Sequence, residues 1–393
     1  MNTSLQIPKR VGLLGVLASL TAASVLLVGC AAYASPPASA TPSAAVVSRL
    51  TDVGQKTLDA GATAFVGTVR DETHISSVAL GTANRGSHRD AKVSDEFEMG
   101  STTKTVTATV ALQLVGEGIL TLKDPIDRWL PGLVPGGDRI TLRMLLQHTS
   151  GIFDYTSDDD FAHGLLDHPE RTYTPKQLVA VAVKHAPNFA PGAGWAYSNT
   201  GFVLVGMILT AATGQSVASL IEHRVIRPLG LSHTYWAGKS VFTGAHLRGY
   251  YRTKPGGTDY VDVSKDSISW AGAAGSLVST TADLGSFERA LQSGKLLKPA
   301  QLAEMRSTVE IPGTGGQYAY GLGLMRITTP NGYVWGHTGG TLGYLTQAWA
   351  SEDGTRSIVE NVPTGASTPV GPDSDIESAA SAAASSLFDL LNK

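Results

Sequence analysis

Apolar and polar positions divide the chain into segments with different periodicity. An unbroken apolar stretch covers residues 11–28, and apolar residues at helical spacing follow at 46–60. Two short runs at 63–70 and 75–81 predict strands on either side of a polar turn. This opening predicts a sheet with a helix packed against it.

Helical spacing dominates the middle of the chain. Val106, Val110 and Leu114 form one apolar stripe, which predicts a helix over 102–116 that ends near Gly118. Further helices are predicted at 142–146, 175–184, 201–212 and 217–224.

Strand patterns return in the last third of the chain. Polar turns separate predicted strands at 320–327, 334–335, 344–350 and 357–361, and a final helix is predicted at 374–391. Strands at both ends with helices between them predict an α/β (α+β layered) fold, in which an antiparallel sheet is flanked by helices and carries an all-α insertion.

The same pattern gives the expected domain organisation. A single domain is expected over 46–393. Its mostly helical subdomain covers about 110–240, and its α/β subdomain combines 46–109 with 241–393.

The first 45 residues resemble an export and tethering region. Lys9 and Arg10 precede the apolar stretch, and small residues follow it, as in a signal peptide. The segment before Cys30 resembles a bacterial lipoprotein processing site, which implies a signal peptide at 1–29 and lipidation of Cys30. An uncleaved membrane anchor and simple secretion remain alternatives. The small, Pro-rich segment 30–45 is expected to be a flexible linker.

Composition narrows the classes of function. The 393 residues are 42% hydrophobic and 16% charged with a net charge of −3, which is typical of a globular protein. No basic patch points to nucleic acid. Cys30 is the only cysteine, so an internal disulfide and a zinc site built on cysteines are excluded. No metal-ligand pattern or cofactor motif is present. The acidic run at 158–160 does not fit a calcium loop and is interpreted as a solvated charged turn.

Ser101 and Lys104 form the first candidate catalytic element. Ser101 precedes a predicted helix, where serine is also the common N-cap residue. Lys104 lies three residues later, on the same helical face, so its amine can meet the Ser101 hydroxyl and accept its proton. Lysine must be neutral to act as a base, which requires burial or nearby positive charge to lower its pKa.

Two further segments carry candidate chemistry. Tyr197 and Asn199 occupy a turn before an apolar helix, where they offer a phenol and an amide, although this segment taken alone favours a loop with a packed Tyr and a capping Asn. His337 and Thr338 follow a predicted strand and begin a Gly-rich turn that includes Gly340. This segment fits either a tight hairpin or a close approach of the backbone to a ligand.

Taken together, the three segments resemble the serine penicillin-recognising enzymes, with a β-lactamase/transpeptidase-like fold. Related members carry Ser-Asp-Asn and Lys-Thr-Gly as the second and third elements, whereas this chain has Tyr-Ser-Asn and His-Thr-Gly. That combination resembles the branch of class C β-lactamases and D-alanyl-D-alanine carboxypeptidases. Supporting matches lie at Leu130-Pro131-Gly132, His148-Thr149-Ser150-Gly151, Pro228-Leu229-Gly230-Leu231 and Tyr320-Gly321-Leu322-Gly323-Leu324.

The resemblance implies roles for the catalytic residues. Ser101 would attack the substrate carbonyl, Lys104 would take the Ser101 proton, and Tyr197 would help to protonate the leaving amine. The backbone N–H groups of Ser101 and Gly340 would stabilise the oxyanion.

It also implies substrate-binding roles. Asn199 would hold the substrate amide, and His337 and Thr338 would face its carboxylate end. Trp270 and Phe153 match positions that line the cleft, where both could equally be ordinary packed aromatics.

This chain differs from the carboxypeptidases at two positions that bind the substrate carboxylate. In the carboxypeptidases, a hydroxyl directly after the third element and an Arg on the preceding strand seat the substrate carboxylate. Here the hydroxyl position is Gly340, and Arg326 is displaced by one residue, which turns a strand side chain to the opposite face.

The expected function is a serine D-alanyl-D-alanine carboxypeptidase, possibly with transpeptidase activity, that acts on peptidoglycan stem peptides and recognises β-lactams. The alternatives are a class C-like β-lactamase, an esterase or D-amino-acid amidase on the same scaffold, and a non-catalytic receptor for cell-wall peptide. The enzyme is expected to lie on the outer face of the bacterial cell membrane, held there by its lipid anchor.

Overall fold

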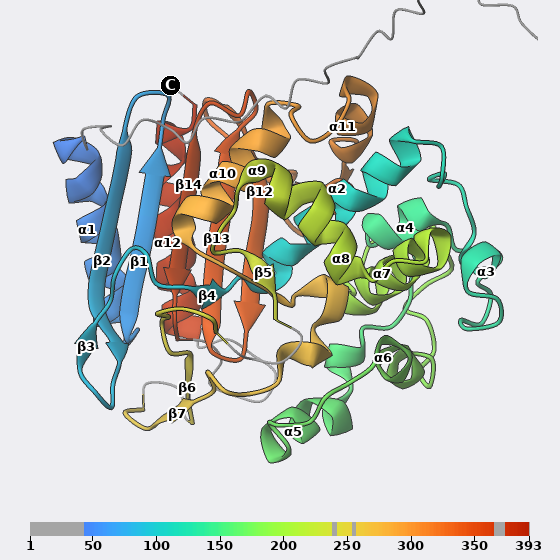
Figure 1. Ribbon diagram of the computed structural model, residues 1–393, viewed down its shortest axis with the longest axis horizontal. Coiled ribbons are helices and arrows are strands. Elements are labelled where there is room, and N and C mark those ends of the chain that lie inside the picture. The colour runs from blue at the N-terminus through green and yellow to red at the C-terminus, as the bar shows by residue number, and fades with distance from the viewer. Residues whose placement is uncertain (1–42, 238–241, 254–256, 365–373, 393) are drawn as a thin grey trace, which may run out of the picture. The chain divides into compact units, whose positions relative to one another are not determined.

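The computed structural model describes residues 43–237, 242–253, 257–364 and 374–392. Its largest element is an antiparallel sheet with the strand order β3-β2-β1-β14-β13-β12-β11-β10-β9 (Figure 1). The strands are β1 (Ala64–Arg70), β2 (Ile75–Asn84), β3 (Arg89–Asp90), β9 (Val309–Glu310), β10 (Tyr318–Tyr320), β11 (Met325–Thr329), β12 (Gly332–Thr341), β13 (Tyr344–Ser351) and β14 (Ser357–Val362). The predicted α/β fold with an antiparallel sheet is confirmed.

Helices cover both faces of this sheet. On one face, α1 (Ala44–Asp59) and α12 (Ser374–Leu387) pack over an apolar cluster that includes Phe65, Trp349 and Ile358. On the other face, α10 (Thr281–Gln292) lies against β13 and β14 (Figure 1). The alternation of side chains along each strand supplies an apolar surface to both helical layers.

The remaining helices lie mostly between β4 (Phe97–Glu98) and β5 (Tyr235–Trp236). They are α2 (Thr103–Gly116), α3 (Ile126–Trp129), α4 (Leu142–Leu146), α5 (Asp159–Asp167), α6 (Pro175–Ala182), α7 (Asn199–Thr213), α8 (Val217–Ile221), a π-helical turn (Glu222–Ile226), α9 (Arg227–Leu229) and, after α10, α11 (Pro299–Met305). Helix α2 is buried at every position from Thr103 to Leu112, so it is a core helix.

Short elements connect these layers. β4 and β5 both pair with β8 (Leu277–Ser279), and β6 (Tyr250–Arg252) pairs with β7 (Tyr260–Asp262). One-turn 3₁₀ helices span Gly100–Thr102, Tyr155–Ser157, Ile268–Trp270, Gly272–Ala274 and Phe388–Leu390. The first of them joins β4 to α2.

Three local predictions are corrected. The predicted strand at 320–327 is two strands, β10 and β11, because the Gly321 N–H donates to Leu324 O in a turn between them. The segment from His337 continues β12 and forms no turn, since Thr338 to Thr341 pair in register with β13. The acidic run begins helix α5, because the Asp158 side chain accepts the N–H of Phe161 as an N-cap.

Within the described part of the chain, no single helix is long and apolar enough to cross a membrane. Helix α7 and the segment Val217–Leu229 meet the length and composition criteria only as a pair bent by 82°. Nine residues of α7 are buried against the rest of the protein, as expected for a core helix.

Candidate active site

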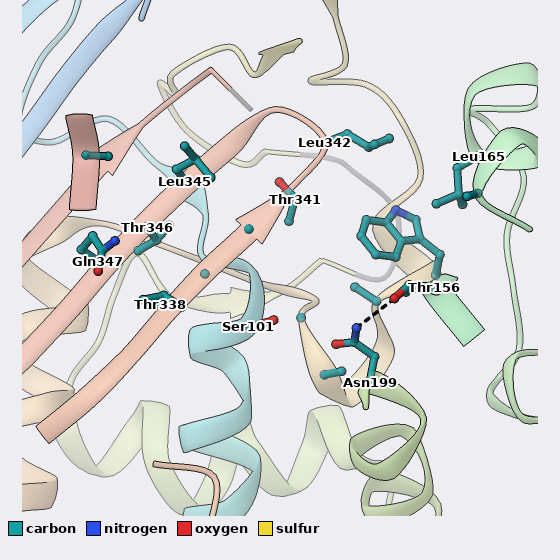
Figure 2. A pocket seen from close by; sticks show the side chains of 18 of the residues that line it. Ser101, Thr156, Leu165, Asn199, Thr338, Thr341, Leu342, Leu345, Thr346 and Gln347 are labelled. Atoms are coloured by element: carbon teal, nitrogen blue, oxygen red, sulfur yellow. Dashed lines mark hydrogen bonds between the residues drawn. The ribbon is translucent and has the colours of Figure 1, made fainter. Parts of the chain in front are cut away.

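Ser101 lies at the start of the buried helix α2, in the 3₁₀ turn Gly100–Thr102. Gly100 has a φ of +52°, a conformation that favours glycine, and this turn brings Ser101 to a cavity of about 330 Å³. Figure 2 shows Ser101 between the strand that carries Thr338 and the helix that begins with Asn199. All three residues line the cavity.

Lys104 lies directly beneath Ser101 and is fully buried. Its Nζ is 2.9 Å from Ser101 Oγ, 2.7 Å from Asn199 Oδ1 and 3.0 Å from the carbonyl oxygen of Ala274. Burial lowers the pKa of Lys104 from 10.5 to about 7, against the opposing charge of Asp154. An amine with that pKa can be neutral near pH 7 and can accept the Ser101 proton.

Tyr197 packs its ring against the amine of Lys104. Its ring centroid is 4.7 Å from Lys104 Nζ, and burial raises its pKa well above the usual range, while the Ser101 hydroxyl opposes that rise. The phenol therefore stays protonated at neutral pH. A protonated phenol beside Ser101 can pass a proton to a departing group.

His148 packs its ring against the ring of Tyr197. Its ring lies 4.3 Å from the Tyr197 ring, and its Nδ1 accepts the backbone N–H of Ser198. His148 is buried with a φ of +61°, an uncommon conformation for a residue other than glycine. Burial and the nearby Lys104 hold its pKa well below the usual range, so His148 is neutral.

Asn199 connects Lys104 to a buried carboxylate. Its Nδ2 donates to Asp154 Oδ2 at 3.0 Å and to Thr156 Oγ1 at 3.2 Å (Figure 2 draws the second bond). Burial raises the pKa of Asp154, while the backbone N–H of Thr156 and the charge of Lys104 oppose the rise. Both amide hydrogens of Asn199 are thus engaged within the protein.

The end of β12 forms one wall of the cavity. β11 pairs with β12 only as far as Gly336, so Thr338 to Gly340 pair with β13 on one side and have no β11 partner on the other. Gly340 packs against Gly100, which places its backbone beside that of Ser101. The N–H groups of Ser101 and Gly340 are therefore available at one place for a developing oxyanion.

His337 lies on the buried side of the same strand. It is 1% exposed and does not line the cavity. The Tyr320 hydroxyl is 2.9 Å from its Nε2, and burial lowers the pKa of His337 to about 3. The structure therefore places Thr338, but not the His337 side chain, where a substrate could be contacted.

The two predicted cleft aromatics differ in position. Trp270 lines the cavity together with apolar residues such as Leu165 and Leu342. Phe153 stacks on His185, with ring centroids 4.0 Å apart, and is not among the lining residues.

The described lining of the cavity carries no Lys, Arg, Asp or Glu side chain. Arg326, the candidate for a substrate carboxylate, packs its guanidinium 4.6 Å from the centroid of the Tyr333 ring, away from this lining. Thr338 is among the polar residues of the cavity lining.

Three residues of the site were not singled out individually from the sequence. Asp154 carries no sequence signal of its own. His148 and Tyr320 belong to the matched segments His148-Thr149-Ser150-Gly151 and Tyr320-Gly321-Leu322-Gly323-Leu324, which were the available signals. Cys30, the predicted lipidation site, lies outside the described residues.

Known proteins share this architecture. The family model described as Beta-lactamase matches residues 49–366. The penicillin-binding protein 4* of Bacillus subtilis (strain 168) is 30% identical over 298 residues, which cover 72% of this chain and 63% of that protein. Esterase EstB of Burkholderia gladioli is 32% identical over 163 residues, which cover 39% of this chain and 41% of the esterase.

Several solved structures match over nearly their whole length. A D-stereospecific amidohydrolase from Streptomyces sp. has 38% sequence identity and a TM-score of 0.77, and the match covers 84% of this chain and 97% of that one. The chain spans only about 60% of the length of the first curated relatives, with individual values of 63%, 58% and 60%.

Proposed function

This chain belongs to the Beta-lactamase family, and we propose that it is a serine hydrolase that cleaves amide or ester bonds of D-amino-acid derivatives lacking a free carboxylate next to the scissile bond. The observation that carries this proposal is the uncharged lining of the cavity beside Ser101 and Lys104. A carboxylate bound in a site normally has a cationic or a strongly donating partner.

The chemistry would proceed through a covalent intermediate. Ser101 Oγ attacks the carbonyl carbon as its proton moves to Lys104 Nζ, and the N–H groups of Ser101 and Gly340 stabilise the oxyanion. The bond to the leaving group breaks as Tyr197 and Lys104 return a proton to it. Water then adds to the acyl ester by the same route in reverse and releases the acid and Ser101.

The lining also favours a class of acyl group. Trp270, Leu165, Leu342 and Leu345 give the cavity an apolar wall that fits an aliphatic or aromatic side chain. The similarity to the D-stereospecific amidohydrolase supports a D-configured acyl donor.

A D-alanyl-D-alanine carboxypeptidase is the second candidate. Thr338 lines the cavity and its hydroxyl can donate to a carboxylate, and the similarity to a penicillin-binding protein supports this assignment. On this alternative the substrate is a peptidoglycan stem peptide or a β-lactam.

The test compares substrates that differ only in their terminal charge. The purified enzyme is incubated with N-acetyl-D-Ala-D-Ala, with the same dipeptide as its C-terminal amide, and with D- and L-phenylalanine amide. We expect faster cleavage of the amidated dipeptide and of D-phenylalanine amide. A preference for the free carboxylate would support the carboxypeptidase, and rapid turnover of a chromogenic cephalosporin would support a β-lactamase. Ser101→Ala is the control that must lack activity.

We also propose that residues 1–29 are a lipoprotein signal peptide, that Cys30 is lipidated, and that the enzyme is tethered outside the cell membrane. The position of the only cysteine, directly after the apolar stretch, supports this location.

A further inference from the structure

Three oxygen atoms surround the amine of Lys104. Asn199 Oδ1 and the carbonyl oxygen of Ala274 can only accept hydrogen bonds, whereas Ser101 Oγ can also donate. A neutral amine has two hydrogens and one lone pair. Its hydrogens therefore go to Asn199 and Ala274, and its lone pair is left facing the hydroxyl hydrogen of Ser101.

This arrangement depends on which end of the Asn199 amide faces Lys104. If the amide were reversed, its NH₂ group would face the amine and compete with Ser101 for the lone pair. The reversed amide would also turn its oxygen toward Asp154 Oδ2, which now accepts from Nδ2 at 3.0 Å. An ionised carboxylate only accepts hydrogen bonds, so two acceptors would then face each other.

The Asp154 carboxylate is itself held in place. It is 9% exposed, and its Oδ1 accepts the backbone N–H of Thr156 at 3.2 Å. This bond caps the 3₁₀ turn Tyr155–Ser157, so the backbone fixes the carboxylate.

We propose that Asp154 is a positioning residue of the reaction: it fixes the Asn199 amide so that the lone pair of Lys104 points at Ser101. This inference rests on the proposed roles of Ser101 and Lys104. It assigns Asn199 to the orientation of the base, because both of its amide hydrogens are already bonded within the protein.

The charged and titratable groups around Lys104 predict how the pH dependence of the rate should change when Asp154 is replaced. Asp154 opposes the fall in the Lys104 pKa, while His148 and His337 are buried neutral and Tyr197 stays protonated. Removal of the Asp154 charge should therefore lower the pKa of Lys104 further. The limiting rate should fall at the same time, because the amide of Asn199 is no longer held in one orientation.

The test is the pH dependence of kcat/KM for hydrolysis of p-nitrophenyl acetate by full-length wild type and Asp154→Asn. Active sites are counted by the nitrophenolate burst, so that misfolded protein does not enter the rate. We expect the plateau to fall by about 10- to 100-fold, part of the roughly 10²- to 10⁴-fold that a positioned base supplies. We also expect the acid limb to move to lower pH.

Two variants complete the design. Asp158→Asn makes the same chemical change four residues away, where the carboxylate caps α5 and contacts His185, and it should leave the profile unchanged. Asn199→Asp places a second carboxylate against Lys104 and should move the acid limb to higher pH, which keeps the test decisive if Asp154→Asn does not fold.

An unchanged plateau in Asp154→Asn, or a shift of the acid limb in the same direction for both variants, would overturn the positioning role. Failure of the proposed function is a separate outcome, because it would appear as a wild-type burst that persists in Ser101→Ala.

Discussion

The backbone of Gly340 lies directly against Gly100, the residue that precedes the nucleophile. A Cβ on Gly100 would lie 2.7 Å from the nitrogen and 2.8 Å from the oxygen of Gly340. The end of β12 can therefore approach the Ser101 turn only because position 100 has no side chain. This contact is what brings two backbone N–H groups to the same side of the cavity.

Gly100→Ala should separate these two segments. The added methyl group must displace β12, and a φ of +52° is unfavourable for alanine. We expect kcat/KM to fall by about 100-fold or more, as for loss of an oxyanion donor. Gly118→Ala is a matched control, because Gly118 has a φ of +75° and no described atom within 4 Å of an added Cβ. It should lose about 1–2 kcal/mol of stability and retain activity; equal losses of activity in both variants would contradict the prediction.

The activity should require a neutral Lys104. Its pKa is about 7, so the amine is protonated below that pH and cannot accept the Ser101 proton. We expect kcat/KM to decrease tenfold per pH unit below about pH 7 and to be level above it. The pKa of His337 is about 3, so ionisation of this histidine cannot cause the decrease in kcat/KM below pH 7. A rate that continues to rise between pH 8 and 10 would indicate a lysine with an ordinary pKa.

Tyr197→Phe should affect substrates according to their leaving groups. An amine must be protonated as it departs, whereas p-nitrophenolate leaves as an anion. We expect a loss of about 100-fold in kcat for an amide, within the usual range for a proton donor, and a much smaller loss for a p-nitrophenyl ester. Tyr333→Phe, at a tyrosine that is 40% exposed, is the control. Similar losses for both substrates would show that Tyr197 does not transfer the proton.

Glu360 should make the protein less stable as the pH rises. It is 1% exposed on β14, neither carboxylate oxygen has a hydrogen-bond partner among the described residues, and burial raises its pKa from 4.5 to about 8. Between these two pH values the folded state keeps the proton and the unfolded state releases it, so stability falls as the pH rises from about 4.5 to about 8.

Glu360→Gln should remove that dependence. We expect a gain of a few kcal/mol in the free energy of unfolding at pH 8, at about 1.4 kcal/mol per unit of pKa shift, and little change near pH 5. Denaturant unfolding at the two pH values measures the difference, with Glu310→Gln at an exposed position as the control. A gain of equal size at both pH values would exclude ionisation as its cause.

Cys30→Ser tests the proposed lipid anchor. The variant cannot be acylated at that position, so we expect the protein to leave the membrane fraction or to remain unprocessed. Fractionation and the mass of the mature protein measure this, and unchanged membrane association with normal processing would rule out lipidation.

The sequence was sufficient for the fold and for the juxtaposition of Ser101 and Lys104, because helical periodicity fixes which side chains share a face. It was insufficient where contacts between distant segments decide the structure. Gly339 and Gly340 suggested a turn, yet they continue β12. The missing side chain at Gly339 permits its close contact with Met99, and the missing side chain at Gly100 permits the approach of Gly340.

The contacts around Lys104 could not be predicted from the sequence either. Asp154 and Asn199 lie 45 residues apart, and no local pattern indicates their hydrogen bond. His337 was placed at the substrate by resemblance, but the side of the strand it occupies depends on its pairing with Ala348 on β13 and on the buried contact with Tyr320.

The pairing of β14 between β1 and β13 has a consequence for synthesis of the chain. The strand nearest the N-terminus finds one of its two neighbours only after residue 357 has been made, so a nascent chain released earlier would expose two open strand edges. Folding of the sheet must therefore wait until nearly the whole polypeptide is available. Fragments that end before β14 should aggregate on release, even when they contain Ser101, Lys104, Tyr197 and Thr338 intact.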